Sequence, residues 1–395
     1  MNYKAEDLLL LARRNYEGSR KFVVVNPFQG KHLPVRPEGA FAMMRRLGCS
    51  VREAFQGERL LCVGFAETAT AIGAVVADVC NCAYIHTTRE RSKEDSVDDF
   101  TFCETHSRWP EQRLRSRNWE RLVRDVDRIV FVEDEISTGK TIRTLASVIR
   151  ERGAALQTPR RDPPRFAAAA LVNELDAQDS QLLHAAGIQE IHLAKAENNR
   201  FDSVASAMEP DLSLLYEADD LPEPSAESAA FIEIGGKVDP RNGLAKGRYG
   251  AACARFAEEL SSALALEYSA SRILVLGTEE FMFPALYVAR FLEQKYPDIV
   301  VYTHSTTLSP IAPCSLPGYP ISSAYRLRSV HDRARESFVY NLAPYDSAVV
   351  VTDSELDSVV LKDVLRGAYK ALAFAGVKKI TAVRWKTMDG QDERR

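Results

Sequence analysis

The sequence lacks the features that mark membrane proteins and nucleic-acid-binding proteins. No apolar run approaches the length of a membrane span, and the run Leu8–Leu11 is soon followed by Arg13 and Arg14. The order of charges and the lack of a small-residue cleavage site argue against a signal peptide. The formal net charge is −4, so no general basic field would recruit nucleic acid. We therefore expect neither a membrane nor a nucleic acid as a partner.

Cysteine is scarce, and its spacing excludes the common metal and redox motifs. The chain has seven cysteines, an odd number, and no C-x-x-C pair of the kind found in zinc or redox sites. Cys80 and Cys82 are separated by a single residue. We expect these thiols to be reduced and to pack as small apolar groups, which is typical of a cytoplasmic protein.

The chain does contain enough apolar material for more than one core. It has 395 residues, of which 46% are hydrophobic and 27% are charged. These fractions are ordinary for a globular protein, and the length suits two domains of average size.

The most informative segment is the stretch R-I-V-F-V-E-D-E-I-S-T-G-K-T-I at 128–142. Ile129–Glu133 is an apolar run that turns acidic, which indicates a buried strand, and 142–150 reads as a helix. The first N–H groups of a helix have no partner within it, so the turn between strand and helix predicts an anion site. The hydroxyls of Ser137, Thr138 and Thr141 would add donors to a phosphate.

Two acids lie directly ahead of this turn, and they narrow its interpretation. Glu133 and Asp134 would repel a phosphate, but they suit sugar hydroxyls or a hydrated magnesium ion. A Walker A loop would need a glycine at the position of Asp134, so the match to Gly139-Lys140-Thr141 fails there. An ordinary capped strand–turn–helix would explain the hydroxyls but not the paired acids.

The acid pair followed by S-T-G-K-T resembles the signature of type I phosphoribosyltransferases, which bind phosphoribosyl pyrophosphate (PRPP). The resemblance implies that Glu133 and Asp134 are catalytic, hold the ribose hydroxyls and contact Mg²⁺ through PRPP or water. It assigns the 5′-phosphate to a loop of five residues: Ser137, Thr138, Gly139, Lys140 and Thr141. In purine-salvage members an aspartate that handles a proton near the base occupies the position of Ser137. The serine leaves the motif without a general base and disfavours a hypoxanthine- or guanine-type acceptor.

A second strand–turn–helix precedes the signature. Residues 59–64 read as a buried strand that ends at Gly64, and a helix follows from about Ala69. In the resembled family the loop after this strand binds pyrophosphate, which implies binding roles for Ala66, Glu67, Thr68 and Ala69. The alternative is a plain strand–helix turn. Arg89, at the end of the next predicted strand, is expected to act in catalysis by neutralising the departing pyrophosphate, although a solvated surface arginine is the alternative.

The segment 90–117 is rich in charge and has no clear periodicity, which predicts a long loop. The resembled family has a flexible loop here that closes over PRPP, and His106 and Arg108 are candidates to reach the pyrophosphate. A solvent-exposed histidine is the alternative for His106. Residues 112–128 are expected to form an amphipathic helix. Flanking pieces such as 22–28 would form a hood over the acceptor.

The C-terminal half repeats the pattern of the N-terminal half more weakly. Residues 272–280, 301–307 and 347–356 parallel the three strands described above, and 49 residues separate His304 from Asp353 where 48 separate His86 from Asp134. The turn after Asp353 lacks T-G-K-T and carries further acids, so the second copy should not bind PRPP in the same way. The turn Thr307-Leu308-Ser309-Pro310 resembles the TRSP motif of a bacterial fusion associated with tellurite resistance, with Leu308 where arginine is usual.

These observations predict an α/β protein with two phosphoribosyltransferase-like domains, each a mainly parallel sheet flanked by helices, the second degenerate. We place the catalytic domain, with its hood and flexible loop, at 1–215, an acidic, proline-containing linker at 216–230 and the TRSP-like domain at 231–395. The expected activity moves 5-phosphoribosyl from PRPP to a nitrogenous, base-like acceptor with Mg²⁺, in making a nucleotide-derived small molecule. A non-catalytic PRPP or nucleotide sensor is the alternative, and an NTPase is disfavoured. A homodimer is compatible with the resemblance, but the sequence does not fix the quaternary state.

Overall fold

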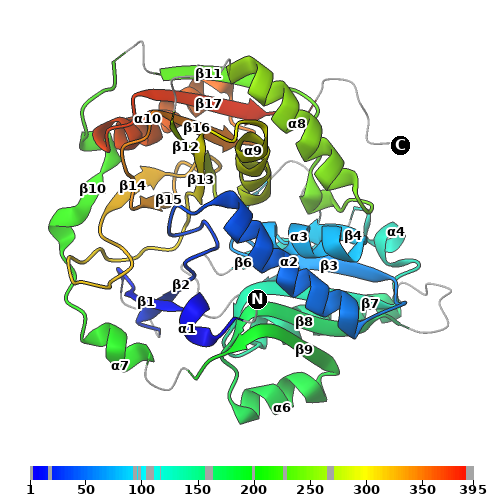
Figure 1. Ribbon diagram of the computed structural model, residues 1–395. Coiled ribbons are helices and arrows are strands. Elements are labelled where there is room, and N and C mark those ends of the chain that lie inside the picture. The colour runs from blue at the N-terminus through cyan, green and yellow to red at the C-terminus, as the bar shows by residue number, and fades with distance from the viewer. Residues whose placement is uncertain are drawn as a thin grey trace.

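The chain forms two α/β units stacked on one another (Figure 1). The structure is a computed structural model, and it describes residues 3–16, 20–91, 96, 99–103, 111–115, 117–155, 163–197, 201–225, 229–264 and 271–387. Each unit is built on a five-stranded sheet in which all neighbouring strands are parallel. Among the described helices, none is long and apolar enough to cross a membrane.

The first sheet belongs to the N-terminal half and is buried on both faces. Its strands run in the spatial order β4 (Ala83–His86), β3 (Leu60–Gly64), β7 (Arg128–Ile136), β8 (Arg165–Asn173) and β9 (Ile188–Lys195). The near-continuous apolar runs in β3 and β8 suit a parallel sheet that helices cover on both sides.

The second sheet has the same plan with one difference in connectivity. Its spatial order is β13 (Val300–Ser305), β12 (Arg272–Gly277), β16 (Ser347–Thr352), β17 (Lys379–Trp385) and β11 (Ala229–Ile234). The first four strands correspond in order to β4, β3, β7 and β8. The fifth place, which β9 fills at the end of the first unit, is filled here by the strand that opens the second unit. The prediction of two phosphoribosyltransferase-like folds is confirmed, and the exchanged edge strand is a feature that the sequence did not reveal.

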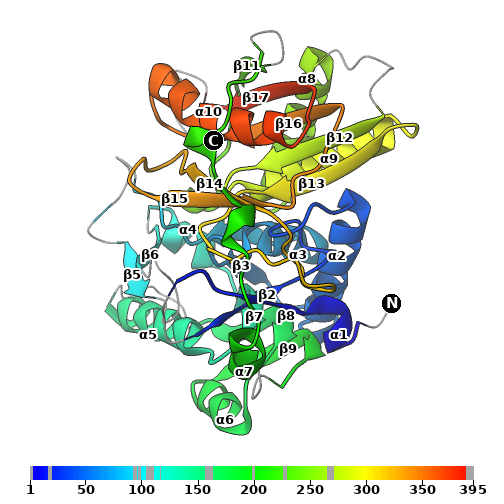
Figure 2. The ribbon, with the colours of Figure 1, turned by 90° about the vertical axis from the view of Figure 1, so that its left-hand side faces the viewer.

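Four helices lie between the two sheets and share one hydrophobic core. They are α2 (Pro37–Ala54) and α3 (Thr70–Cys80) from the first unit, and α8 (Arg248–Leu264) and α9 (Met282–Lys295) from the second. Helix α9 contacts both α2 and α3, and buried residues of all four helices belong to the same cluster (Figures 1 and 2). The two units therefore do not fold around separate cores at this boundary.

The remaining helices cover the outer faces and edges. On the first unit these are α1 (Ala5–Leu8), α4 (Trp119–Val123), α5 (Lys140–Ala155), α6 (Ala177–Ala185) and α7 (Phe201–Ser206), and on the second unit α10 (Ser358–Phe374). Leu145 and Ile149 of α5 pack under the first sheet, and Leu361 and Leu365 of α10 pack under the second.

Three small sheets lie outside the two main ones. Antiparallel pairs join β1 (Leu10–Arg13) to β2 (Phe22–Val25) and β5 (Phe100–Cys103) to β6 (Glu111–Leu114), and a third sheet joins β10 (Leu215–Glu217), β14 (Ala324–Arg328) and β15 (Glu336–Tyr340). The expected helix over 112–128 is wrong for most of its length: the first part is strand β6, and only α4 is helical. Within the predicted linker at 216–230, β10 pairs with β14, so this part is packed against the second unit.

Candidate active site

The predicted signature lies where the first sheet changes direction. The chain passes from β3 to β4 on one side and returns to place β7 on the other side of β3, so the loops after β3 and β7 diverge. Such a switch point leaves a crevice at the carboxyl ends of the strands, where ligands of open α/β sheets bind. A cavity lies at this point. Its walls include Ala66, Glu67, Thr68, Arg89, Glu133, Asp134, Ser137, Thr138, Gly139, Lys140 and Thr141.

The turn after β7 presents the start of α5 to the cavity. Gly139 has a φ of 62°, a conformation that side chains disfavour, and an added Cβ would lie 3.0 Å from Leu183 Cδ1. Helix α5 begins at Lys140, so its first N–H groups and its positive dipole end lie beside the hydroxyl-bearing turn. The Lys140 N–H lies 3.4 Å from Thr138 Oγ1. This arrangement suits a phosphate monoester.

The acid pair and the loop after β3 are tied together across the cavity. Thr68 donates its hydroxyl to Asp134 Oδ1 at 2.8 Å, and the other carboxylate oxygen lies 3.9 Å from Lys31 Nζ. Gln29 donates its side-chain amide to the Thr68 carbonyl at 2.7 Å. Glu133 lies on the same wall. The predicted ribose residues and part of the predicted pyrophosphate loop therefore meet in one place.

Glu67 lies in this loop, but its side chain binds the second unit. Its carboxylate accepts hydrogen bonds from the Thr307 hydroxyl and from the Leu308 N–H, the latter at 3.0 Å to Oε1. Burial raises the pKa of Glu67, while Lys31 and Arg89 and the Thr307 hydrogen bond act in the opposite sense. A carboxylate held by these hydrogen bonds keeps the loop in position, and no local sequence pattern predicts this contact.

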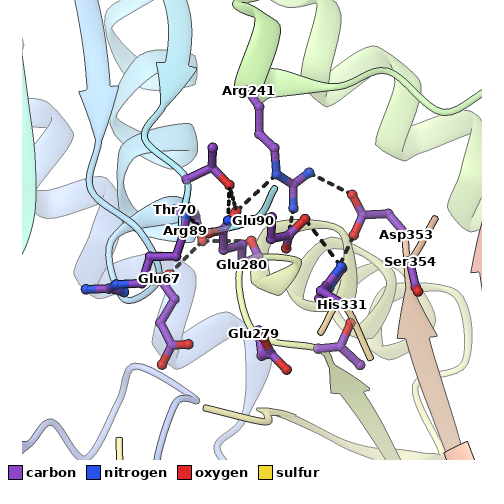
Figure 3. A network of polar contacts seen from close by, with 12 residues as sticks. Glu67, Thr70, Arg89, Glu90, Arg241, Glu279, Glu280, His331, Asp353 and Ser354 are labelled. Atoms are coloured by element: carbon purple, nitrogen blue, oxygen red, sulfur yellow. Dashed lines mark hydrogen bonds and ion pairs between the residues drawn. The ribbon is translucent and has the colours of Figure 1, made fainter. Parts of the chain in front are cut away.

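Arg89 also depends on the second unit for its position. Its N–H donates to Glu280 Oε1 at 2.7 Å, and its carbonyl accepts from Arg335 Nη1 at 2.9 Å. Both Glu280 (Figure 3) and Arg335 belong to the second unit. Because Arg89 lines the cavity, its positive charge would attract an anion there.

A further wall of the cavity, the β1–β2 wall, comes from β2, from the segment between β1 and β2 and from the TRSP-like turn, and it is partly apolar. Arg20 forms ion pairs with Glu135 and with Glu174, the latter at 3.7 Å. The guanidinium carbon of Arg14 lies 5.2 Å from the centre of the Tyr16 ring. Further residues on this wall are Val23, Val24, Leu308, Ser309 and Pro310.

The sequence singled out residues after β3 and β7 that line the cavity, but it missed other residues of the lining. Lys31, Glu135 and Arg20 line the cavity and were not predicted. Lys31 follows Gly30 shortly after the segment 22–28, and this glycine–lysine pair is the signal that could have indicated it. His106 and Arg108 lie outside the described residues.

The oxygen-bearing side chains of the cavity show which kind of magnesium site the residues would fit. Among the described residues, no group of three or more His, Cys, Asp or Glu side chains could hold a metal on its own. Mg²⁺ commonly takes one or two carboxylates together with substrate phosphates. Glu133 and Asp134 fit that pattern and do not fit an all-protein metal cage.

The equivalent position in the second unit is closed by an arginine. Gly64 pairs with Val132 and Gly277 with Val351, so Asp353 occupies the register of Asp134. Asp353 accepts from Arg241 Nη1 at 2.8 Å (Figure 3). Arg241 is 3% exposed.

Other acids complete the ion pairs around this arginine. Arg241 also donates to Glu280 at 3.0 Å and to Glu90 at 2.8 Å. The positive charge of Arg241 holds the pKa of Asp353 below its ordinary value against the effect of burial. Side chains of the protein thus fill the place where a ligand would lie, as expected for a degenerate copy.

The fold and this site define a phosphoribosyltransferase-type α/β protein. A phosphoribosyl transferase family model matches residues 8–189, and a model of the TRSP domain that lies C-terminal to it matches residues 241–367. The chain therefore contains a phosphoribosyl transferase domain followed by a TRSP domain. No curated protein matches the chain.

Solved structures that resemble the chain include two adenine-type enzymes and one hypoxanthine-type enzyme. Adenine phosphoribosyl transferase from Trypanosoma brucei is 13% identical, over 48% of this chain and 77% of that one, with a TM-score of 0.33. APRTase from Giardia lamblia is 11% identical over 49% and 96%, with a TM-score of 0.36. A hypoxanthine phosphoribosyltransferase from Staphylococcus aureus is 12% identical over 42% and 78%, with a TM-score of 0.23. At these scores the likenesses carry no argument about function.

Proposed function

We propose that the protein is a PRPP-dependent phosphoribosyltransferase that moves 5-phosphoribosyl to a nitrogenous, base-like acceptor and releases pyrophosphate. One observation carries the proposal: an acid pair and a helix-terminal hydroxyl turn lie side by side on one cavity wall. A phosphorylated sugar can span both, with its hydroxyls at Glu133 and Asp134 and its 5′-phosphate at 137–141. The product would be a nucleotide-like small molecule.

The protein's own part in this reaction is positioning and electrostatic stabilisation. Asp134, already fixed by Thr68, would accept hydrogen bonds from the ribose hydroxyls and hold the anomeric carbon in place. Arg89 would stabilise the charge that develops on the departing pyrophosphate. Mg²⁺, bound to the pyrophosphate and contacted by Glu133 or Asp134, would neutralise part of that charge.

The acceptor would lie against the β1–β2 wall. Apolar side chains there suit the faces of a flat ring, and Glu135 offers a carboxylate to its N–H groups. Buried Glu135 Oε2 has no hydrogen-bond partner within the described part of the chain. With serine at 137, Glu135 of β7, which pairs with Arg20 of the β1–β2 wall, is the carboxylate that we assign to the acceptor's proton.

A non-catalytic PRPP sensor is the second candidate, and Ser137 is the observation that favours it. A sensor would need the phosphate and ribose contacts but no proton acceptor beside the base. The two candidates therefore differ in turnover and not in PRPP affinity.

Incubation with PRPP, Mg²⁺ and a panel of purine, pyrimidine and related heterocyclic bases tests the proposal, with pyrophosphate release as the readout. We expect release that depends on one class of base and that falls strongly in Glu135→Gln. Tight PRPP binding without release for any base would support the sensor. Failure to bind PRPP at all would refute both.

A further inference from the structure

Two carboxylates at equivalent positions, Glu67 and Glu280, each accept hydrogen bonds from the other unit. In the first, Glu67 of the loop after β3 accepts from the Thr307 hydroxyl and the Leu308 N–H of the loop after β13. In the second, Glu280 of the loop after β12 performs the same task in the opposite direction. It accepts from the Thr88 hydroxyl at 2.8 Å and from the N–H of the next residue, at the end of β4, at 2.7 Å.

The register of the sheets shows that these contacts are equivalent. Gly64 pairs with His86 in the first sheet, and Gly277 pairs with Ser305 in the second. Counting from the two glycines, Glu67 and Glu280 are both the third residue. Counting from the pairing partners, Thr88 and Thr307 are both the second.

Two further contacts follow the same rule. Val35, just before α2, bridges to Thr303 of β13, and Leu244, just before α8, bridges to Tyr84 of β4. In a twofold, isologous dimer, residue i of one subunit contacts residue j of the other, and residue j of the first contacts residue i of the second. The two units of this single chain therefore pack as the two halves of such a dimer.

In the second unit, the position equivalent to the candidate ligand site is filled by a side chain, but the contacts with the first unit are present. Arg241 fills the position opposite Asp353. By contrast, the groups that reach into the first unit end on two parts of its cavity wall: the loop that carries Glu67, and the main chain of Arg89, which is held on its N–H by Glu280 and on its carbonyl by Arg335.

We propose that the TRSP-like unit acts as a built-in dimer partner that positions the pyrophosphate side of the active site. Thr307 and Arg335 are its positioning residues: Thr307 fixes the loop through Glu67, and Arg335 fixes Arg89. The inference rests on the proposed function, because it assigns the pyrophosphate to these two elements. The ribose and 5′-phosphate contacts come from β7 and α5 of the first unit, and the hydrogen bond from Thr68 to Asp134 links them to the loop that carries Glu67.

Thr307→Val in the full chain tests the inference, with calorimetric titration of inorganic pyrophosphate plus Mg²⁺ and, separately, of ribose 5-phosphate. We expect pyrophosphate affinity to fall about ten-fold, the equivalent of one hydrogen bond to a charged group, and ribose 5-phosphate affinity to fall much less, because Thr68 is the link between this loop and the ribose acid. Thr307→Ser keeps the hydroxyl and should restore pyrophosphate affinity. Arg335→Ala, from a side chain at the rim of the interface, should give the same selective loss if Thr307→Val does not fold.

Thr278→Val is the matched control, because it removes a buried hydroxyl whose 3.0 Å partner, Thr352, lies in the second unit. It should leave both affinities at the wild-type level. Equal losses for both ligands in Thr307→Val, or no loss in either positioning variant, would overturn the inference while the proposed function stands. A wild-type chain that binds ribose 5-phosphate and PRPP but does not bind inorganic pyrophosphate would overturn it as well. If the wild type bound none of the three ligands, the proposed function itself would fail.

Discussion

Asp134 and Asp353 occupy the same register in two sheets of the same strand order, yet their surroundings differ. Asp134 lines a cavity, with Thr68 and Lys31 on one side and open space on the other. Asp353 is 4% exposed and is covered by Arg241. The comparison teaches that one fold can leave a carboxylate facing a cavity in one copy and use it in a buried ion pair in the other. The difference lies in the segment before α8, which places Arg241 opposite the second carboxylate.

The largest effect on stability should come from removing the charge of Asp353 in the second unit, where Arg241 fills the site. Asp353→Asn leaves the buried Arg241 guanidinium short of a negative partner, and loss of one member of a buried ion pair costs about 3–5 kcal/mol. We expect the free energy of unfolding in urea to fall by this order and, in the protein that remains folded, PRPP affinity to be unchanged. Loss of PRPP binding with normal stability would reverse the roles that we give to the two copies.

The next effect should come from the open copy. Asp134→Asn keeps the shape but removes the negative charge that binds ribose hydroxyls, and a lost charged contact of this kind costs about 2–4 kcal/mol. We expect ribose 5-phosphate affinity, measured by calorimetry, to fall roughly 100-fold with little change in melting temperature. Asp127→Asn, at the other end of the same strand and paired with Arg59 on the surface, should bind like the wild type. Equal affinities in all three proteins would count against the ribose site.

A third prediction concerns pH and the residue that replaces Ala66 in the second copy. That residue is Glu279, and burial raises its pKa to about 8, with Glu67 adding to the shift. Because the folded pKa lies above the unfolded one, the protonated carboxyl stabilises the fold below about pH 4.5, and this stability is lost as the pH rises toward 8. The slope is about 1.4 kcal/mol per pH unit.

Glu279→Gln should remove this contribution. Urea unfolding at several pH values between 5 and 8 should show a shallower decline of stability in Glu279→Gln than in the wild type. Parallel curves for the two proteins would show that Glu279 titrates normally in the fold.

The smallest effect should come from the turn that distinguishes the open copy. Gly139→Ala adds a Cβ at a φ of 62° and close to Leu183, which should cost about 1 kcal/mol of stability. The shifted turn should also weaken binding of inorganic phosphate several-fold. Gly57→Ala is the control for a positive φ alone, since no atom lies within 4 Å of its added Cβ, and it should not alter phosphate binding.

The parts of the candidate site that could be predicted from the sequence are those formed by residues that are consecutive in the chain. The stretch 128–142 carries strand, acids, turn and helix start within one unit of local structure, so periodicity and residue chemistry were sufficient. Lys31, Arg20 and Thr307 reach the cavity or its loops from elements far away in the chain. Their placement depends on tertiary packing, which no local pattern reports.

The fold shows the same division. That the two halves form parallel sheets of the same kind could be inferred from the repeated motifs. The fifth strand of the second sheet could not, because β9 ends its unit whereas β11 begins its own. The expected helix over 112–128 failed because residues 111–114 pair with β5, and this long-range pairing overrode the local pattern. The reciprocal contacts of Glu67 and Glu280 became visible only when the two sheets could be aligned by register.

Titration of PRPP with Mg²⁺ into the wild-type chain tests most directly the claim that one copy is open and the other closed. We predict one PRPP bound per chain, with that site lost in Asp134→Asn and kept in Asp353→Asn. Two sites per chain, or a single site that survives Asp134→Asn and disappears in Asp353→Asn, would contradict it.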